Sequence, residues 1–245
     1  MVYGEGKTRC EAISVTSMLS RLGGPVLELL FPLRCVGCDR EGRFLCERCH
    51  GGLPKLIRPY CSVCAAPGGP DPCEWCASER PAIDGIRAPY LMEGAVRDAV
   101  HGFKYRDYRA GAPELGRLLA GFLASRTMAA SVLVPVPLHW RRERERGYNQ
   151  SALLARELGK LIDAPVDNRL LRRTRHDPPQ VSLDGYEERR RNIEGAFECR
   201  APLDGVAVLL IDDVVTTGST MSACASALKA AGATSVWGLA LARQA

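Results

Sequence analysis

Two adjacent carboxylates, Asp212 and Asp213, stand between an aliphatic run and a turn that is rich in hydroxyl groups. The run at residues 208–211 predicts a short strand buried on both faces of a parallel sheet. Residues 221–231 are rich in Ala and Leu and predict a helix that ends at Gly232. A turn between a strand and a helix is typical of an anion site, because backbone N–H groups and the positive end of the helix dipole attract phosphate.

The turn supplies further groups for an anion: Thr216, Thr217, Gly218, Ser219 and Thr220. The hydroxyls can donate hydrogen bonds to a phosphate, and the glycine lets the backbone turn or approach closely. The carboxylates need a different partner, and a sugar diol suits them because it donates two hydrogen bonds. The pattern favours a ligand with a phosphate at one end and a ribose diol close by. The alternative is an ordinary strand–turn–helix in which the acids cap the helix.

Eight of the eleven cysteines form four Cys-x-x-Cys pairs, namely Cys35/Cys38, Cys46/Cys49, Cys61/Cys64 and Cys73/Cys76. Two pairs complete a four-thiolate shell around one tetrahedral ion, so eight cysteines predict two Zn²⁺ sites. Consecutive pairing matches tandem zinc ribbons, and interleaved pairing stays open. Iron and disulfides are the alternatives. Residues 1–16 contain no signal peptide, so we expect a cytoplasmic location, where disulfides do not persist.

The cysteine-rich segment also needs metal in order to fold. Residues 33–79 contain few large apolar side chains and several Gly and Pro, too little to build a core. Structural zinc contributes on the order of 10–16 kcal/mol in zinc-finger peptides, which is enough to fold such a module.

Two arginine-rich segments, at residues 141–150 and 172–192, flank predicted strands. Charged runs are most often solvated faces. Arginine nevertheless suits phosphate, because its planar fork can bind two oxygens at once. Residues 176–188 have the composition of a lid that closes over a site.

The rest of the chain alternates between predicted strands and helices. Strands are expected at residues 86–91, 132–136 and 235–241, and helices at 94–101, 114–125 and 149–161. This alternation predicts a mostly parallel α/β sheet flanked by helices, with ligands at the carboxyl ends of the strands.

The 245 residues divide into three predicted parts. Residues 1–17 form a loose tail, and a later start near Met18 stays an open alternative. Residues 18–80 hold a short helix and the cysteine module, and residues 81–245 form the α/β domain. The helix at 18–31 is too short and too broken to span a bilayer, so no membrane span is expected. The net charge of +5 is mild and does not by itself indicate nucleic acid.

The strand, acid pair and turn resemble the phosphoribosyl-pyrophosphate (PRPP) signature of type I phosphoribosyltransferases. The resemblance implies that Asp212 and Asp213 hold the ribose hydroxyls and that residues 216–220 hold the 5′-phosphate. It also implies Mg²⁺ bound together with PRPP, and displacement of pyrophosphate by a nitrogen of an unidentified base.

Further motifs resemble the ComF family of competence-associated phosphoribosyltransferases, whose members join a cysteine-knuckle module to such a domain. They are residues 135–138, Arg146 to Gln150, Lys104-Tyr105, residues 180–192 and residues 195–197. The family resemblance implies that Leu138 lies in the pyrophosphate-binding loop. It places Lys104, Arg146, Arg189, Arg191 and Asn192 among the residues that close over pyrophosphate.

The ComF resemblance also implies a role in DNA uptake, and it leaves two kinds of function open. The first is an active phosphoribosyltransferase. The second is a non-catalytic protein that senses PRPP or binds single-stranded DNA on its basic face, where Tyr105, Tyr108, Tyr148 and Tyr186 offer rings for base stacking. In either case the zinc module is a candidate docking site for a protein of the competence machinery.

Overall fold

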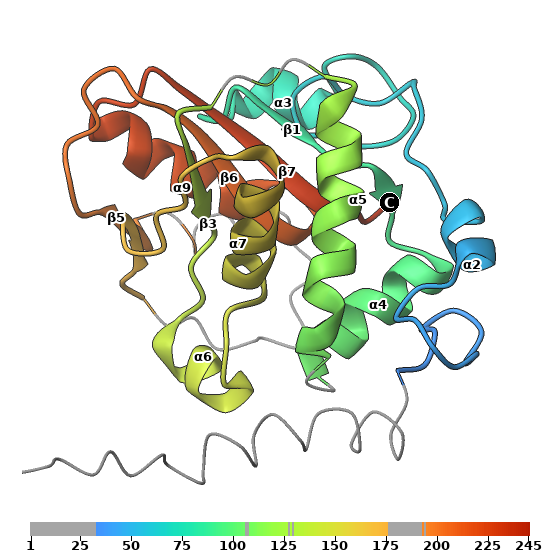
Figure 1. The fold of residues 1–245 in the computed structure, drawn as a ribbon. Helices are drawn as coiled ribbons and strands as arrows, with labels where there is room; N and C mark the ends of the chain where they lie inside the picture. Colours follow the sequence, from blue (N-terminus) through green and yellow to red (C-terminus); the bar gives the residue numbers. More distant parts are fainter. Residues whose placement is uncertain (1–32, 106–107, 127, 129, 176–192, 194) are drawn as a thin grey trace, which may run out of the picture.

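The computed structural model describes residues 33–245 except 106–107, 127, 129, 176–192 and 194 (Figure 1). The predicted tail, the predicted helix at 18–31 and the whole predicted lid at 176–188 therefore lie outside the described residues. Within the described part of the chain, no helix has the length and apolarity needed to cross a bilayer.

A parallel sheet forms the centre of the fold, and its strands run in the order β1-β7-β6-β3. Their bounds are β1 Gly85–Arg87, β3 Val132–Pro135, β6 Ala207–Val215 and β7 Ser235–Arg243. A short strand, β2 (Tyr90–Leu91), pairs with the end of β7, also in parallel. The long central strands are buried on both faces, which explains their unbroken aliphatic sequences. The predicted mostly parallel sheet is confirmed.

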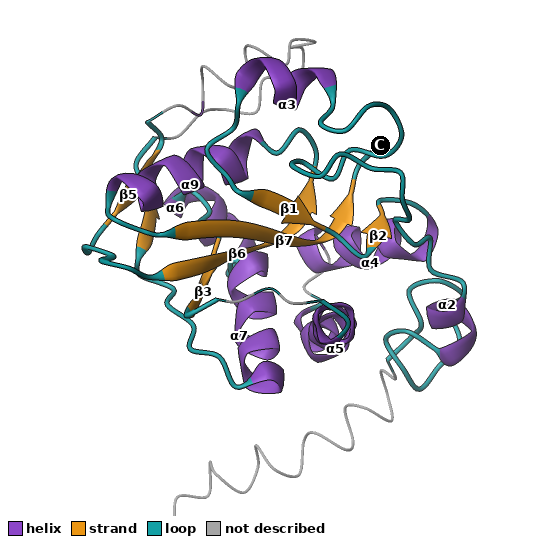
Figure 2. Cartoon of the chain, turned by 90° about the horizontal axis from the view of Figure 1, so that it is seen from above, coloured by secondary structure: helices purple, strands orange, loops and turns teal. Residues whose placement is uncertain are grey.

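Helices cover both faces of this sheet (Figure 2). One face carries α4 (Gly94–Tyr105), α5 (Ala112–Ala124) and α7 (Gln150–Ile162), and the other carries α9 (Ser219–Ala230). Alternate residues of β6 serve the two faces, as the pleat of a strand requires. Leu209 packs in the cluster with α5 and α7, and Leu210 packs in the cluster with α9.

Several boundaries differ from the predicted ones. Strand β6 continues through Asp212 and Asp213 to Val215, whereas the prediction ended the strand before the acids. The ladder continues because β7 also runs on, pairing Ala242 with Val214 and Arg243 with Val215. Helix α4 extends beyond the predicted residue 101 to Tyr105, which places Lys104 in its last turn.

Helix α6 (Trp140–Arg146) and the strands β4 (Leu171–Arg173) and β5 (Phe197–Cys199) of the α/β domain were not predicted. Helix α6 occupies the first arginine-rich segment. His139 is its N-cap, with a side chain that accepts from the Arg141 N–H, and Gly147 is its C-cap, with a positive φ of 77°. The antiparallel pair of β4 and β5 brackets the segment that includes the predicted lid.

The cysteine-rich segment folds into two modules that pack against the α/β domain. The first contains α2 (Glu47–Gly51) and the second contains α3 (Glu74–Glu79). Phe44 of the first module packs against Gly111, where an added Cβ would lie 2.5 Å from the ring. Cys35, Phe44, Leu45 and Leu53 belong to the same hydrophobic cluster as α4 and α5. The modules therefore share apolar packing with the domain, in keeping with the small number of apolar residues they contain.

Candidate functional site

The acid pair lies at the carboxyl end of β6, and its two carboxylates have different neighbours. Asp213 Oδ2 lies 3.0 Å from Lys104 Nζ, and both side chains are largely buried. Asp212 Oδ1 accepts a hydrogen bond of 2.8 Å from the Ser151 hydroxyl and one of 2.9 Å from its neighbour's backbone N–H. The pair is thus held between the end of α4 and the start of α7.

The surroundings of Asp212 disfavour its ionised form. Burial, and next the charge of Asp213, raise its pKa to about 7, although Ser151 and Lys104 act in the opposite direction. In the described part of the chain, one half-buried lysine, Lys104, lies beside the two acids, so the second carboxylate has no cation of its own there. A cation or a hydroxyl donor that reaches this carboxylate would lower the free energy of its ionised form. Carboxyl groups with such perturbed pKa values are typical of functional sites.

The hydroxyl-rich turn follows the acids and opens α9. Gly218 has a positive φ of 84° and stands at the N-cap, where it brings no side chain to the helix end. Thr217 Oγ1 and Ser219 Oγ lie 2.9 Å apart, and the Ser219 N–H donates to Thr217 Oγ1 at 3.3 Å. Thr216 is exposed, while Thr217 and Thr220 are half-buried. The turn has the backbone and hydroxyl donors that a phosphate requires.

The Arg-Gly-Tyr-Asn-Gln motif forms the scaffold that positions these groups. The Asn149 side chain accepts from the Ser151 N–H and donates to the Val136 carbonyl at 3.1 Å, which fixes the start of α7 beside β3. The Tyr148 hydroxyl donates to the Phe103 carbonyl at 2.5 Å, and Gln150 Nε2 donates to the same carbonyl at 3.4 Å. These bonds hold the end of α4 where Lys104 meets Asp213.

Ser151 is a site residue that sequence reasoning missed. Its one signal is its position directly after the motif, in the first turn of a predicted helix. No rule of spacing connects it with an aspartate sixty-one positions further along the chain.

A basic cavity of about 710 Å³ lies beside the acid pair, and it is lined by Lys104, Tyr105, Arg109, Arg142, Glu145, Arg146 and Tyr148. Arg146 Nη1 donates to Gln150 Oε1 at 3.1 Å, and its guanidinium lies 5.4 Å from the Tyr105 ring centre. Burial, and next the charges of Arg173 and Arg146, lower the pKa of Arg142. Four cations against one acid make this cavity suited to an anion with several charges.

The predicted pyrophosphate residues do not all meet in this cavity. Lys104 and Arg146 line it together. Leu138 lines a neighbouring cavity of about 410 Å³, with Trp140 and Arg173. Arg189, Arg191 and Asn192 lie outside the described residues, so their predicted place over the site stays a prediction.

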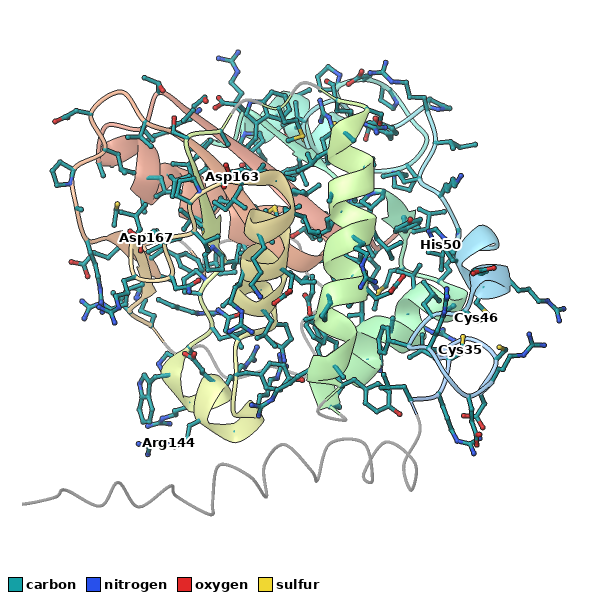
Figure 3. All side chains as sticks on the ribbon, viewed as in Figure 1. Cys35, Cys46, His50, Arg144, Asp163 and Asp167 are labelled. Atoms are coloured by element: carbon teal, nitrogen blue, oxygen red, sulfur yellow. The ribbon has the colours of Figure 1, made fainter. Side chains whose placement is uncertain are left out.

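The eight paired cysteines gather into two groups of four. Cys35, Cys38, Cys46 and Cys49 form one group, and Cys61, Cys64, Cys73 and Cys76 form the other; within each, the sulfurs lie within 4.8 Å of one another. The structure therefore has consecutive pairing, and the interleaved alternative is wrong. Figure 3 shows Cys35 and Cys46 close together, with His50 nearby on α2 and outside the four-sulfur group.

Both groups fit a tetrahedral metal. In the first group the Cys46 N–H donates to the Cys35 sulfur, and in the second the Cys73 N–H donates to the Cys61 sulfur, each at 3.3 Å. Burial opposes ionisation of Cys35, but backbone N–H groups of Cys46, Gly37 and Cys38 outweigh it and lower its pKa to about 6. Four clustered sulfurs with N–H donors are the donor set that zinc takes in structural sites.

Comparison with known proteins assigns the chain to a family. Residues 26–81 match the double zinc ribbon domain. Competence protein F of Haemophilus influenzae is 30% identical over 228 residues, which cover 86% of this chain and 97% of that protein. This chain belongs to the ComF family. The ComF-family relatives also include Escherichia coli K12 DNA utilization protein YhgH, 31% identical over 82% of this chain and 85% of that protein. Bacillus subtilis competence protein ComFC is 28% identical over 75% of this chain and 77% of that protein.

Solved structures similar to this ComF-family chain align over about half of it. The B. subtilis glutamine PRPP amidotransferase, complexed with ADP and GMP, has a TM-score of 0.37 at 20% identity. That alignment covers 53% of this chain and 26% of the amidotransferase. The protein TT1426 from Thermus thermophilus has a TM-score of 0.33 at 20% identity and aligns over 52% of this chain and 72% of its own.

The variant Asp212→Asn should be more stable than the wild type, and the difference in stability should grow as the pH rises. The folded-state pKa of Asp212, about 7, lies above the ordinary value of 3.8, so the folded chain binds more protons than the unfolded chain between these values. The wild type therefore loses free energy of unfolding as pH rises through this window, and the variant does not. We expect the melting temperature of Asp212→Asn to exceed that of wild type increasingly up to about pH 7, at roughly 2–4 °C for each kcal/mol.

Asp98, which is exposed on α4, provides the matched control. Asp98→Asn should follow the wild-type pH profile in thermal unfolding. If the Asp212 and Asp98 variants have the same profile, the account of the acid pair is wrong.

Proposed function

We propose that this chain binds PRPP at the carboxyl end of β6 and transfers its phosphoribosyl group to a nitrogenous base, releasing pyrophosphate. The observation that carries the proposal is the position of the acid pair. Asp213 contacts Lys104, which also lines the basic cavity, and β6 leads directly from the acids into the hydroxyl-rich turn.

Each part of PRPP has a matching group of residues along this edge. The 5′-phosphate suits the turn at 216–220, where α9 begins. The ribose hydroxyls suit the carboxylates, since a diol can donate to Asp212 without adding charge. The pyrophosphate suits the cavity with Lys104, Arg142 and Arg146. The order of the three groups follows the order of the three parts of the ligand.

The reaction class follows from the charges. The bond between the anomeric carbon and the pyrophosphate oxygen breaks, and a bond from that carbon to a base nitrogen forms. Positive charge develops on the sugar, next to the carboxylates, and negative charge on the departing pyrophosphate, next to the arginines. Mg²⁺ bound with PRPP would neutralise part of the pyrophosphate charge, and the oxygens of the acid pair are donors of the kind that Mg²⁺ prefers.

PRPP with Mg²⁺ should raise the melting temperature of the wild-type protein. At a ligand concentration of about 100 times Kd, binding adds about 2.7 kcal/mol to the free energy of unfolding. We expect the double variant Asp212→Asn/Asp213→Asn to lose this rise, and Asp98→Asn to keep it.

An enzyme and a PRPP sensor then differ in turnover. An enzyme should release pyrophosphate when PRPP is mixed with the right member of a panel of purine, pyrimidine and other nitrogenous bases. Thermal stabilisation without release from any base would favour the sensor, and no stabilisation of wild type would contradict the PRPP site itself.

We further propose that the two cysteine groups hold structural Zn²⁺ and that the protein acts in DNA uptake or use in the cytoplasm. Reduced thiolates, which the groups need for zinc, persist in that compartment. The names of the relatives, competence protein F and DNA utilization protein, support the association with DNA. Docking of a competence-machinery protein would use the outer faces of the modules, which the α/β domain leaves uncovered.

The purified protein should contain about two zinc ions per chain by elemental analysis, one for each four-sulfur group. Cys46→Ser should lower the content to about one, because one thiolate leaves the first group. Cys199 lies outside both groups, so Cys199→Ser should leave the content unchanged. A wild-type content near zero would contradict the assignment of zinc.

A second candidate function, binding of single-stranded DNA, is favoured by the surface of α6. Trp140 is 56% exposed, and the guanidinium groups of Arg141 and Arg144 lie 5.2 and 5.7 Å from its ring centre. Figure 3 places Arg144 on the outer side of this helix. Exposed rings among arginines are the stacking and backbone contacts that single-stranded nucleic acid uses.

Trp140→Ala should weaken binding of an oligothymidylate about tenfold, the order expected when one stacked base is lost. Binding should be salt-sensitive and should survive in the Asp212→Asn/Asp213→Asn variant. Fluorescence anisotropy measures both. Equal affinity of Trp140→Ala and wild type would remove the support that α6 gives to this function.

A further inference from the structure

A buried arginine, Arg243, links the second cysteine module to the turn at 216–220. It is the last residue of β7, and only 6% of it is exposed. Its Nε donates to the Cys64 carbonyl at 3.2 Å, on the second module. Its Nη1 donates to the carbonyls of Val215, at 3.4 Å, and of Thr216, at the start of the turn. One guanidinium thus spans a metal-ligand loop and the residues that lead into α9.

The partners of Arg243 do not neutralise its charge. Nη1 also donates to the Gln244 carbonyl, so every partner is a backbone oxygen. Among the residues that the structure describes, no carboxylate forms an ion pair with it. Burying a cation whose partners are carbonyl dipoles alone costs free energy. Here its positive charge lies behind the turn that we assign to phosphate.

The turn also rests directly on the second module. A Cβ added at Gly218 would lie 3.0 Å from Ile86 Cδ1 and 3.7 Å from Cys64 Cβ, so this close approach favours glycine in addition to its positive φ. The same loop of the module is tied to β1, since the Ile86 N–H donates to the Val63 carbonyl at 2.6 Å. Arg87 Nη1 donates to the Ser62 carbonyl at 2.7 Å. Residues 61–64 are therefore fixed between β1 and the turn.

We propose that Arg243 is a positioning residue for the phosphate turn and that it makes the second cysteine module part of the support of that turn. Four sulfurs around one metal fix the conformation of residues 61–64. Because Nε and Nη1 belong to one planar guanidinium, the hydrogen bonds of Arg243 fix the position of the Thr216 carbonyl relative to the Cys64 carbonyl. The first module packs on α4 instead, with Gly37 against Ala95, and among the described residues no side-chain hydrogen bond joins it to the turn.

Arg243→Lys tests the fork separately from the charge, because lysine keeps the cation but cannot reach both carbonyls with a planar group. Arg87→Lys is the matched control, since Arg87 contacts the same loop of the module but not the turn. Hydrogen exchange of the amides in residues 216–220 should be faster in zinc-loaded Arg243→Lys than in wild type, and unchanged in Arg87→Lys. Ribose 5-phosphate, which carries the one phosphate of interest, should bind Arg243→Lys about tenfold more weakly, a difference of about 1.4 kcal/mol.

A second pair of variants covers the case in which Arg243→Lys does not fold. Cys73→Ser disrupts the second four-sulfur group, and Cys46→Ser disrupts the equivalent position of the first. Exchange in residues 216–220 should rise in the Cys73 variant alone. Equal exchange in the two cysteine variants would overturn the proposal.

The proposal rests on the proposed function only where it concerns phosphate. If wild type does not bind ribose 5-phosphate, the phosphate assignment fails, while faster exchange in Arg243→Lys still supports the positioning role. If wild type binds ribose 5-phosphate and Arg243→Lys matches it in both affinity and exchange, the positioning role is overturned and the phosphate assignment stands.

Discussion

Two neighbouring carboxylates at the end of a buried strand are the constraint on which the rest of the site depends. Burial disfavours the charged form of Asp212, which accepts a hydrogen bond from Ser151, and Lys104 forms an ion pair with Asp213. These groups come from the end of α4 and the start of α7. The hydrogen bonds from Tyr148 and Gln150 to Phe103 join those two helix ends. The positions of Lys104 and Ser151 beside the acids therefore depend on contacts within the helix layer that covers the sheet.

The two cysteine modules have similar internal geometry and different positions in the fold. Each has two Cys-x-x-Cys pairs, a short helix after the third cysteine, and one N–H···S bond of the same length. The first packs on α4, the helix that carries Lys104, and the second packs on β1 and on the turn that opens α9. One module thus supports the cation side of the candidate site and the other supports the hydroxyl-rich side.

Patterns that repeat along the chain were predictable from the sequence. The period of apolar residues predicted α5, α7 and the central strands to within a few residues. Cysteine spacing predicted two four-sulfur groups but left open which pairs share a group, which the structure decides. The strand end was misplaced because charged residues normally leave a buried strand, whereas here the ladder with β7 continues past them. Helix α6 was missed because its sequence, all charged after Trp140, shows no apolar period.

Contacts between distant segments were beyond sequence reasoning. Ser151 and Arg243 each act on a residue far away along the chain, and neither belongs to a motif with a fixed spacing. The topology brings them to the site. Arg243 reaches it because β7 lies beside β6 in the sheet, and Ser151 reaches it because α7 packs on one face of that sheet. A sequence can indicate that a polar residue ends a buried strand, as Arg243 does, but not which carbonyl it reaches.

The apolar packing between the first module and the α/β layers bears on where the chain can be divided. Phe44 fills the space above Gly111, and Leu45 and Leu53 lie in the same cluster as Val100 and Leu115. A fragment that begins at residue 81 would leave this patch facing water and would remove the support from beneath the turn. The cysteine-rich segment therefore packs as part of one folding unit with the α/β domain, and we expect versions of the protein that lack it to aggregate.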